Sequence, residues 1–470
     1  MTDLMEILEF LKNALWGGPL LFLLVGVGVY QTWVLQGLQF RHFFHGLKLL
    51  VLGQDKYEPI SEHEKNGELS AFQSLMTSLA GAVGTGNITG VAIALSLGGY
   101  GALFWMWVIA LFGMITAYSE AVLAVRFRQK GENGTVIGGP MQTLLHGLQM
   151  KKSALAFAIF CIISSFGIGA TIQSNSVAAG LQESFGIAPY WTGLVMAFIT
   201  ACVVLGGVKS IGKAASVLVP FMAISYLGAG ILVLMVHVES LIPALLLIVR
   251  SAFTGHAAVG GFLGATFVTA IQHGVSIGIF ANEAGLGSLA IAASTARTKH
   301  AARQGFLAIS GVFISTMVIC TMTGMVIAVT DVLSQGSQGA QLTGSALTIA
   351  AFSQVRPEFG LVVVFGLVFF AFTSVLAWAC YGEKTVEFLW GAKPAKIYRY
   401  LYTVAVFLGT LIEPHSVWVF ANLANGLMAI PNLFSIVRLS SVVKEETQLY
   451  LTYLRSRGDK EISKVEVLQN

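Results

Sequence analysis

The feature that most constrains this chain is the recurrence of apolar stretches about 20 residues long along almost its whole length. A helix needs roughly 20 residues to cross the roughly 30 Å hydrocarbon layer of a bilayer. Only 11% of the residues are charged, against about 25% in a soluble domain. We therefore predict an all-α polytopic protein whose partner is the lipid bilayer, with no soluble domain between the helices.

Hydropathy predicts eleven spans, at residues 15–36, 69–95, 102–125, 153–180, 190–206, 216–238, 264–295, 304–328, 359–390, 397–412 and 414–437. With the N-terminus outside, 24 of the 27 lysines and arginines fall at cytoplasmic connections or in the C-terminal tail. That bias predicts a multi-pass protein of the cell inner (plasma) membrane with a cytoplasmic C-terminus. The acidic residues Asp3, Glu6 and Glu9 are unlike a signal peptide, so we expect the first span to be retained.

Two spans contain clusters of glycine with a polar residue, around Asn87 and around Glu283. Each glycine costs about 1 kcal/mol relative to alanine in a helix, so we predict that both helices are broken inside the membrane. Unwound backbone at that depth is tolerated only where protein or a cavity satisfies it. The alternative is that the glycines only allow helices to pack closely.

The broken spans open two blocks of five spans, 69–238 and 264–437. Because five is odd, the blocks have opposite orientations, which predicts an inverted repeat with a substrate site at the breaks. The other regions are an extra N-terminal helix with a cytoplasmic loop (1–68), an extracellular connection (239–263) and a cytoplasmic tail (438–470).

The first break, residues 80–88, contains no ionisable side chain. Backbone N–H groups near Thr85 and Gly86, at the start of the second half-helix, would attract a carboxylate. Free carbonyl groups of the first half-helix would attract a cation such as Na⁺. This chemistry suits a zwitterion bound together with a cation.

Several motifs resemble known transporters. AVGTGN at 82–87 is similar to the broken first helix of LeuT-fold sodium symporters, and GGYGALFWMWVIALFG at 98–113 resembles the signature of the alanine or glycine:cation symporter family. GPM at 139–141 and NEAGLGS at 282–288 extend the likeness. The resemblance implies a LeuT-like 5+5 inverted repeat with discontinuous first and sixth repeat helices plus one extra N-terminal helix. It also implies uptake of alanine or glycine with Na⁺, or with H⁺ in some members, by alternating access.

The resemblance further implies ion sites made of oxygen atoms, which hard cations prefer. One Na⁺ would take three carbonyls and two hydroxyls, from Ala80, Val83, Phe370, Thr373 and Ser374. A possible second Na⁺ would take the Ala82 carbonyl, the Asn87 side chain and the substrate carboxylate. Because Ala281 and Glu283 stand where hydroxyl donors are expected, the stoichiometry stays open. The two hydroxyls could instead bond to their own helix.

For the substrate, Ser165, Gly169 and Gln173 recur every four residues and form one small, polar helix face. Gln173 would contact the amino acid, or would only make an interhelical hydrogen bond. Trp378, four residues after Ser374, would close the side-chain end of the pocket beside Phe280. A wall of that size favours alanine or glycine, although Trp378 could equally belong to the core or face lipid.

Three ionisable residues and the four cysteines need separate explanations. Glu283, costly inside a span, would cap the half-helix after the second break or carry a proton. Glu120 would join an ion pair near Arg126, and His273 would be a packed donor. The cysteines lie in apolar stretches without metal-type spacing and are expected to pack in the core.

Rival classes have little support in the sequence. It has no HExxH zinc motif and no phosphate-binding loop, so we predict that the chain is not an enzyme. The sequence lacks the filter repeat that a channel would need. Membrane topology explains the positions of the basic residues, so we expect no nucleic-acid partner. An H⁺-coupled amino-acid symporter is the remaining alternative. We expect Na⁺ as the coupling ion, no covalent cofactor, and a segment at 342–355 that covers the extracellular vestibule.

Overall fold

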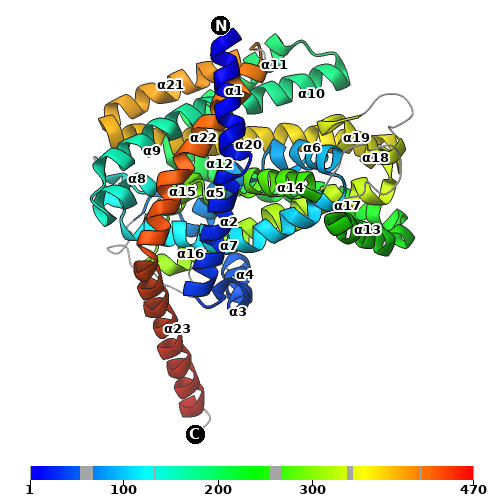
Figure 1. Ribbon diagram of the computed structural model, residues 1–470. Coiled ribbons are helices and arrows are strands. Elements are labelled where there is room, and N and C mark those ends of the chain that lie inside the picture. Colours follow the sequence, from blue (N-terminus) through cyan, green and yellow to red (C-terminus); the bar gives the residue numbers. More distant parts are fainter. Residues whose placement is uncertain are drawn as a thin grey trace.

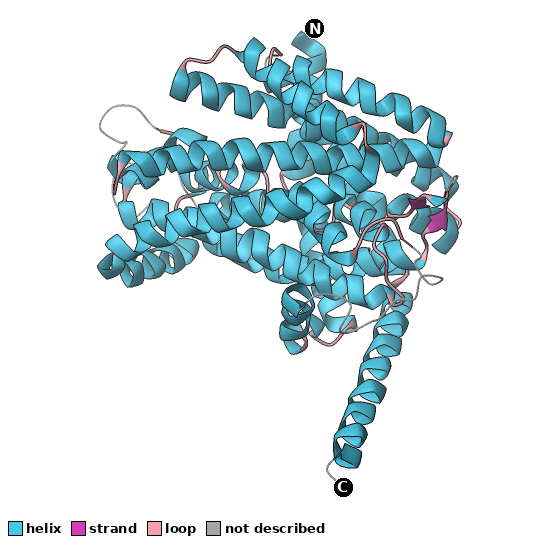
Figure 2. Ribbon diagram, turned by 180° about the vertical axis from the view of Figure 1, so that it is seen from behind, coloured by secondary structure: helices cyan, strands magenta, loops and turns pink. Residues whose placement is uncertain are grey.

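The structure is a computed structural model that describes residues 2–52, 67–131, 134–254, 267–335, 342–412 and 414–468. The described residues are almost entirely helical, as Figure 1 shows. One small antiparallel sheet joins β1 (Gln129–Lys130) to β2 (Val136–Ile137), drawn in magenta in Figure 2. Residues 53–66 of the predicted loop after the first span, residues 255–263 of the 239–263 connection and the start of the seventh span lie outside the described residues.

Helices occupy every predicted span. Six predicted spans are single helices, and the first five of these are α7 (Gly101–Arg126), α11 (Pro189–Val204), α12 (Gly207–Val236), α20 (Pro357–Trp390) and α21 (Ala392–Gly409). The last predicted span is α22 (Pro414–Arg438). Two long helices contain a π-helical stretch: α9 (Lys151–Ser164) continues through Ser165–Ile172 into α10 (Gln173–Phe185), and α16 (Ala301–Val312) continues through Phe313–Cys320 into α17 (Thr321–Thr330).

The two predicted interruptions are confirmed. The first broken helix consists of α5 (Ala71–Ala82), a 3₁₀ turn (Thr85–Asn87) and α6 (Thr89–Gly98). The second consists of α14 (Phe267–Asn282) and α15 (Ser288–Ser294), which a nonhelical stretch separates. In both cases the glycine clusters mark the residues at which the α-helix stops.

The remaining elements connect and cover this bundle. They are α3 (Leu38–Arg41), α4 (Phe43–Leu52), α8 (Pro140–Gln142), a π turn (Thr143–Gly147), a 3₁₀ turn (Val238–Ser240), α13 (Leu241–Thr254), α18 (Val332–Gln335), α19 (Gly344–Ser353) and α23 (Ser440–Leu468). α19, within the predicted covering segment, lies on α6, and Thr348 donates to the Ile88 carbonyl at 3.3 Å. α23 projects away from the bundle in Figure 1.

The first predicted span starts earlier than hydropathy suggested. α1 (Thr2–Trp16) and α2 (Pro19–Val34) are separated only by Gly17 and Gly18, and Met5–Val34 forms one candidate span. Among the described residues, 7 helices are long and apolar enough to cross a membrane, and α6, α11 and α19 are shorter apolar helices.

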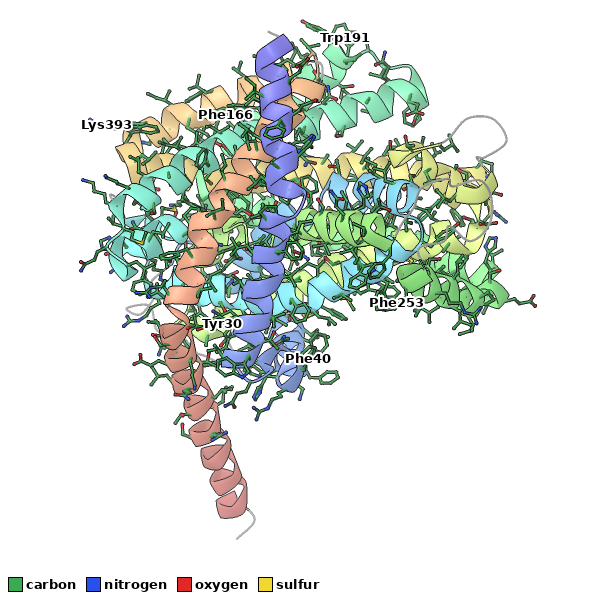
Figure 3. All side chains as sticks on the ribbon, viewed as in Figure 1. Tyr30, Phe40, Phe166, Trp191, Phe253 and Lys393 are labelled. Atoms are coloured by element: carbon green, nitrogen blue, oxygen red, sulfur yellow. The ribbon has the colours of Figure 1, made fainter. Side chains whose placement is uncertain are left out.

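Large apolar side chains remain exposed around the bundle, as expected of a surface that contacts lipid. Trp191 is 60% exposed and Phe253 57% exposed, and both lie at the periphery in Figure 3. Cys161, Cys320 and Cys380 are buried as predicted, but Cys202 is exposed. The core-packing prediction is therefore wrong for Cys202, because one face of α11 points outward and a small thiol is acceptable there.

α4 packs between α16 and the start of α23. The Nε2 atom of His45 lies 3.2 Å from the Tyr450 hydroxyl, and its ring meets the Phe306 ring edge-on at 5.0 Å. Burial, helped by the nearby positive charges of His42 and Arg303, lowers the pKa of His45 to about 4. The imidazole is therefore neutral at pH 7 in the folded protein.

Candidate substrate and ion sites

The first break meets α20 through a serine hydroxyl. Ser374 Oγ donates to the Ala80 carbonyl at 3.0 Å and lies 3.5 Å from the Gly81 carbonyl. A Cβ atom on Gly84 would come within 2.5 Å of Ser374 Oγ, so only glycine allows this approach. The contact brings two of the five predicted sodium ligands together from helices almost 300 positions apart in sequence.

Thr373 and Phe370 occupy the neighbouring turn of α20. Thr373 Oγ1 donates to the Phe370 carbonyl at 3.0 Å, and it lies 3.4 Å from Met222 Sδ. Both residues are fully buried, as are Ala80 and Ser374. Thr373 thus bonds within its own helix, whereas Ser374 reaches across to the break. Val83, the last predicted ligand of this site, is buried immediately after α5 ends.

Asn87, predicted for a second Na⁺, has a full set of partners. Its Oδ1 accepts from the Gly84 N–H at 3.0 Å, and its Nδ2 donates to the carbonyl and hydroxyl of Ser315, each at 3.0 Å. The Ala82 carbonyl belongs to the last turn of α5, where carbonyls lack helical partners. The amide of Asn87 therefore already shapes the break before any ligand binds.

Ser315 connects the two breaks and was missed by sequence reasoning. Besides accepting from Asn87, its hydroxyl donates to the Ala281 carbonyl at the end of α14. Ser315 lies in the π-helical stretch Phe313–Cys320, and π-helical stretches are frequent at functional sites. A serine within an apolar span was the only available signal.

Gln173 faces the first break with an unsatisfied oxygen. The side chain is 3% exposed, and its Oε1 has no hydrogen-bond partner among the described residues. A Cβ atom on Gly84 would lie 3.5 Å from this oxygen. The other two residues of the predicted polar face contact neighbouring helices. Ser165 accepts a hydrogen bond from the Tyr398 hydroxyl at 2.9 Å, and Gly169 packs against Trp378.

The second break is held by its own acid. Glu283 has a positive φ of 53°, and its Oε2 accepts from the Ser288 hydroxyl at 2.7 Å. Ser288 is the first residue of α15. The other oxygen, Oε1, accepts from Trp378 Nε1 at 3.1 Å. Glu283 thus attaches the start of α15 to α20, through a hydroxyl and an indole.

Glu120 belongs to this same network. Its Oε1 accepts from the Gly287 N–H at 3.0 Å and from Asn432 Nδ2 at 2.5 Å, and Asn432 also donates to the Gly285 carbonyl at 3.0 Å. The predicted ion-pair role of Glu120 is wrong, because none of the described cationic side chains pairs with it. Arg126 pairs with Glu446 of α23 at 2.9 Å, whereas Glu120 is buried on a different face of α7.

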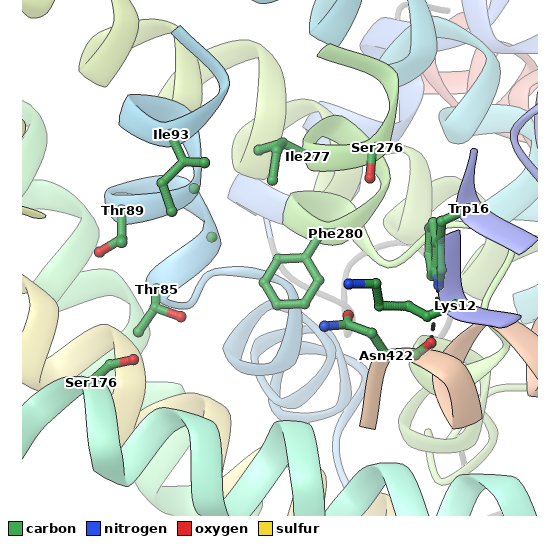
Figure 4. A pocket seen from close by; sticks show the side chains of 12 residues that line it. Lys12, Trp16, Thr85, Thr89, Ile93, Ser176, Ser276, Ile277, Phe280 and Asn422 are labelled. Atoms are coloured by element: carbon green, nitrogen blue, oxygen red, sulfur yellow. Dashed lines mark hydrogen bonds between the residues drawn. The ribbon is translucent and has the colours of Figure 1, made fainter. Parts of the chain in front are cut away.

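Thr85, Gly86 and Phe280 line a pocket of about 290 Å³ beside the breaks, shown in Figure 4. The Phe280 ring packs against Gly86, where an added Cβ would approach it to 2.8 Å. Gln173 and Trp378 do not line this pocket. The five predicted substrate residues are therefore divided, with three at the pocket, Gln173 at the first break and Trp378 bonded to Glu283.

A buried ion cluster closes another part of the bundle. Lys384 Nζ lies 2.5 Å from Glu68 Oε1 and 3.1 Å from Glu387 Oε2, and the lysine is 1% exposed. Glu68 also accepts from the Val136 N–H at 2.8 Å, and Glu387 accepts from the Thr135 hydroxyl. The cluster joins the segment before α5, the β1–β2 hairpin and the end of α20.

Ser276 is not a catalytic nucleophile, although it stands in a GxSxG string at 274–278. Hydrolases place that serine on a sharp turn between a strand and a helix. Here the string lies inside α14.

Comparison of the sequence with known proteins identifies a family of transporters. Residues 1–464 match the model of the sodium:alanine symporter family. The sodium/alanine symporter AgcS of Methanococcus maripaludis is 43% identical over 95% of this chain and 97% of its own length. An uncharacterized transporter of Haemophilus influenzae is 41% identical over 96% of this chain and 97% of its own.

Among solved structures, MhsT in complex with L-phenylalanine is similar with a TM-score of 0.55 and 14% identity, over 82% of this chain and 99% of that chain. This likeness shows a shared architecture, the LeuT-type fold with broken helices.

Proposed function

The chain belongs to the sodium:alanine symporter family and is a membrane transporter rather than an enzyme, and we propose that it carries alanine or glycine into the cell together with Na⁺. The relative AgcS, named as a sodium/alanine symporter, supports this substrate and this ion. The orientation that we propose has the N-terminus outside and the C-terminus in the cytoplasm of the plasma membrane.

The observation that carries the sodium proposal is the contact between Ser374 and Ala80. A hydroxyl and a carbonyl 3.0 Å apart, both buried, provide two oxygens of the uncharged kind that a hard cation accepts. The Phe370 carbonyl and the Thr373 hydroxyl add two more on the next turn of α20. In our proposal Na⁺ enters between these groups and the Val83 carbonyl, which strengthens the attachment of α20 to the first break.

The substrate proposal rests on the polar groups that the first break leaves unpaired. The first N–H groups of the turn that starts at Thr85 have no helical partners, and they suit a carboxylate. The unpartnered Oε1 of Gln173 suits an ammonium group. Phe280 limits the space for a side chain, which favours alanine or glycine. Trp378 acts in this proposal through Glu283, by holding the second break in place.

We propose alternating access with the ion cluster around Lys384 as one of its two gates. In the proposed orientation this cluster seals the cytoplasmic side, while the 290 Å³ pocket is accessible from outside. In this proposal Na⁺ and the amino acid bind from the outside. The outer pocket then closes at Phe280, and the ion cluster around Lys384 separates to open the site to the cytoplasm. The Ala82 carbonyl and Asn87 remain candidates for a second Na⁺.

Proton coupling is the second candidate, and one observation favours it. Within the described residues, the buried carboxyl groups of Glu120 and Glu283 have no cationic partner, and Glu120 Oε2 has no hydrogen bond. Buried charges without a partner are costly, so a proton on one of these groups is the simplest way to neutralise it. Such a proton would be a coupling ion only if it moves during transport.

The deciding experiment is uptake of radiolabelled alanine and glycine into proteoliposomes, with an inward Na⁺ gradient compared with an inward H⁺ gradient at matched membrane potential. We expect concentrative uptake with Na⁺ alone. Uptake with H⁺ alone would overturn the sodium proposal and direct mutagenesis to Glu283. A lack of uptake of both amino acids would overturn the substrate proposal.

A further inference from the structure

The pocket beside the breaks contains one charged side chain among the described residues that line it. That residue is Lys12, from α1, and it is partly buried. α1 precedes both five-helix blocks, so this lysine comes from the part of the chain that is extra to the repeat. Thr85 and Thr89 line the side of the pocket away from Lys12 in Figure 4, and Phe280 lies between them and Lys12.

A fixed contact holds α1 at the pocket. Trp16 Nε1 donates to the Asn422 carbonyl at 3.0 Å, and α1 packs along α22. Lys12 precedes Trp16 by one helical turn, so the two side chains lie on the same face of α1. Figure 4 shows the Lys12 ammonium and the Asn422 amide close together on the Phe280 side of the pocket.

The rest of the wall offers hydrogen bonds but no opposite charge. Ser176 and Ser276 contribute hydroxyls, and the buried hydroxyl of Thr89 has no partner among the described residues. A lysine in such a wall attracts an anion, because a lysine–carboxylate hydrogen bond is about twice as strong as a neutral one. The volume of about 290 Å³ accommodates a small amino acid.

We propose that Lys12 makes its own end of this pocket an outer capture site for the carboxylate of an α-amino acid, with Phe280 between that end and Thr85 of the central site. The inference rests on the proposed function, since the captured amino acid is the one that is transported. Capture needs no Na⁺, because Lys12 supplies the positive charge and the proposed sodium ligands lie elsewhere. The extra helix α1 is thereby part of the substrate path.

The first test compares Lys12→Gln, Lys12→Arg and Arg356→Gln in alanine uptake. Arg356 is exposed and lies outside the pocket, so its variant is a control for the loss of one positive charge. We expect K12Q to raise KM about tenfold with little change in kcat, and K12R and R356Q to resemble the wild type. An unchanged KM in K12Q, or an equal rise in R356Q, would overturn the inference. Absence of alanine uptake by the wild type would refute the proposed function instead.

A second measurement keeps Lys12 in place and covers the case in which K12Q does not fold. Ser276→Cys is introduced together with Cys202→Ser, which removes the exposed native thiol. In detergent without Na⁺, the rate of labelling by a polar thiol reagent is measured with and without alanine. We expect alanine to slow the labelling at least severalfold, and alaninamide, which lacks the carboxylate, to have little effect. Equal rates with and without alanine would contradict the capture site.

Discussion

The two broken helices differ in what keeps them open. In the first break, Gly84 has an extended backbone and is glycine because Ser374 approaches it closely. In the second break, the chain turns through left-handed conformations, with φ of 53° at Glu283 and 86° at Gly287. The first break thus leaves the Gln173 oxygen facing it without a partner among the described residues, whereas Asn282, Glu120 and Asn432 side chains bond to the backbone of the second break.

This difference assigns different tasks to two elements that hydropathy alone treats alike. The polar groups of the first break include the unpartnered oxygen of Gln173, which a ligand can use. In the second break, Glu120 and Asn432 bond to the backbone of Gly287 and Gly285 and Ser288 bonds to Glu283, while Asn282 Nδ2 and Glu120 Oε2 have no partner among the described residues. We infer that variants of the first break change ion and substrate affinity, and that variants of the second change stability.

The largest expected effect is on the first break. Thr373→Ala combined with Ser374→Ala removes the two hydroxyl groups of the proposed sodium site, each worth about 1.5 kcal/mol when bonded to a charge. The Na⁺ concentration for half-maximal uptake should therefore rise about 100-fold. The measurement is alanine uptake against external Na⁺, with Thr385→Ala as the control. Thr385 lies on the same helix, and among the described residues it bonds to its own helix carbonyl and to Cys161. Unchanged Na⁺ dependence in the double variant would contradict the assignment of ion binding to the first break.

The next effect is on the second break. Glu283→Ala leaves the Trp378 indole and the Ser288 hydroxyl without their acceptor, which should cost about 2 kcal/mol of folding free energy. Glu283→Gln keeps one acceptor and should lose less. Thermal unfolding in detergent measures both variants. If E283Q abolished transport at normal stability, Glu283 would carry a coupling proton, and the break would not be only structural.

Two alanine substitutions at glycine distinguish the breaks more finely. Gly287→Ala forces a left-handed residue and should cost about 1–2 kcal/mol of stability. Gly84→Ala meets no such backbone penalty, but its methyl group displaces Ser374. It should therefore raise the Na⁺ concentration needed for half-maximal uptake, with a smaller loss of stability. Parallel melting curves and Na⁺ titrations check this. The same pattern for both variants would show that the breaks are not different in kind.

The smallest expected effect is on the pH dependence of stability, and it comes from His45, which lies outside both breaks. Because burial lowers the pKa of His45 from 6.5 to about 4, the folded state favours the neutral ring. Its contribution to stability is complete above pH 6.5 and is lost as the pH falls from 6.5 towards 4. His45→Gln, which can still bond to Tyr450, should flatten the stability profile over that range. A profile that stays equally steep would direct attention to the carboxyl groups of the second break.

The sequence predicted the helices and their breaks well, because both depend on local composition. Each span predicted from an apolar stretch contains a helix, and the glycine clusters correctly placed both interruptions. The partners of the polar residues were not predictable in the same way. Asn432 reaches Glu120 across 312 positions and Lys384 reaches Glu68 across 316, and no local pattern encodes such pairs. The family resemblance supplied the Ser374 and Ala80 pair, but it gave no indication of Ser315.

The cluster at Lys384 has a consequence for how the protein moves in time. One ammonium group is shared by two carboxylates, which also hold the β1–β2 hairpin. If one segment leaves, the remaining charges stay buried without their partner, so partial opening is costlier than either end state. If the cluster is the gate that we propose, the segments must separate together, and thermal fluctuation of a single loop would not open a leak for ions between transport cycles. The transition at this end should therefore be abrupt, with a steep dependence of its rate on temperature.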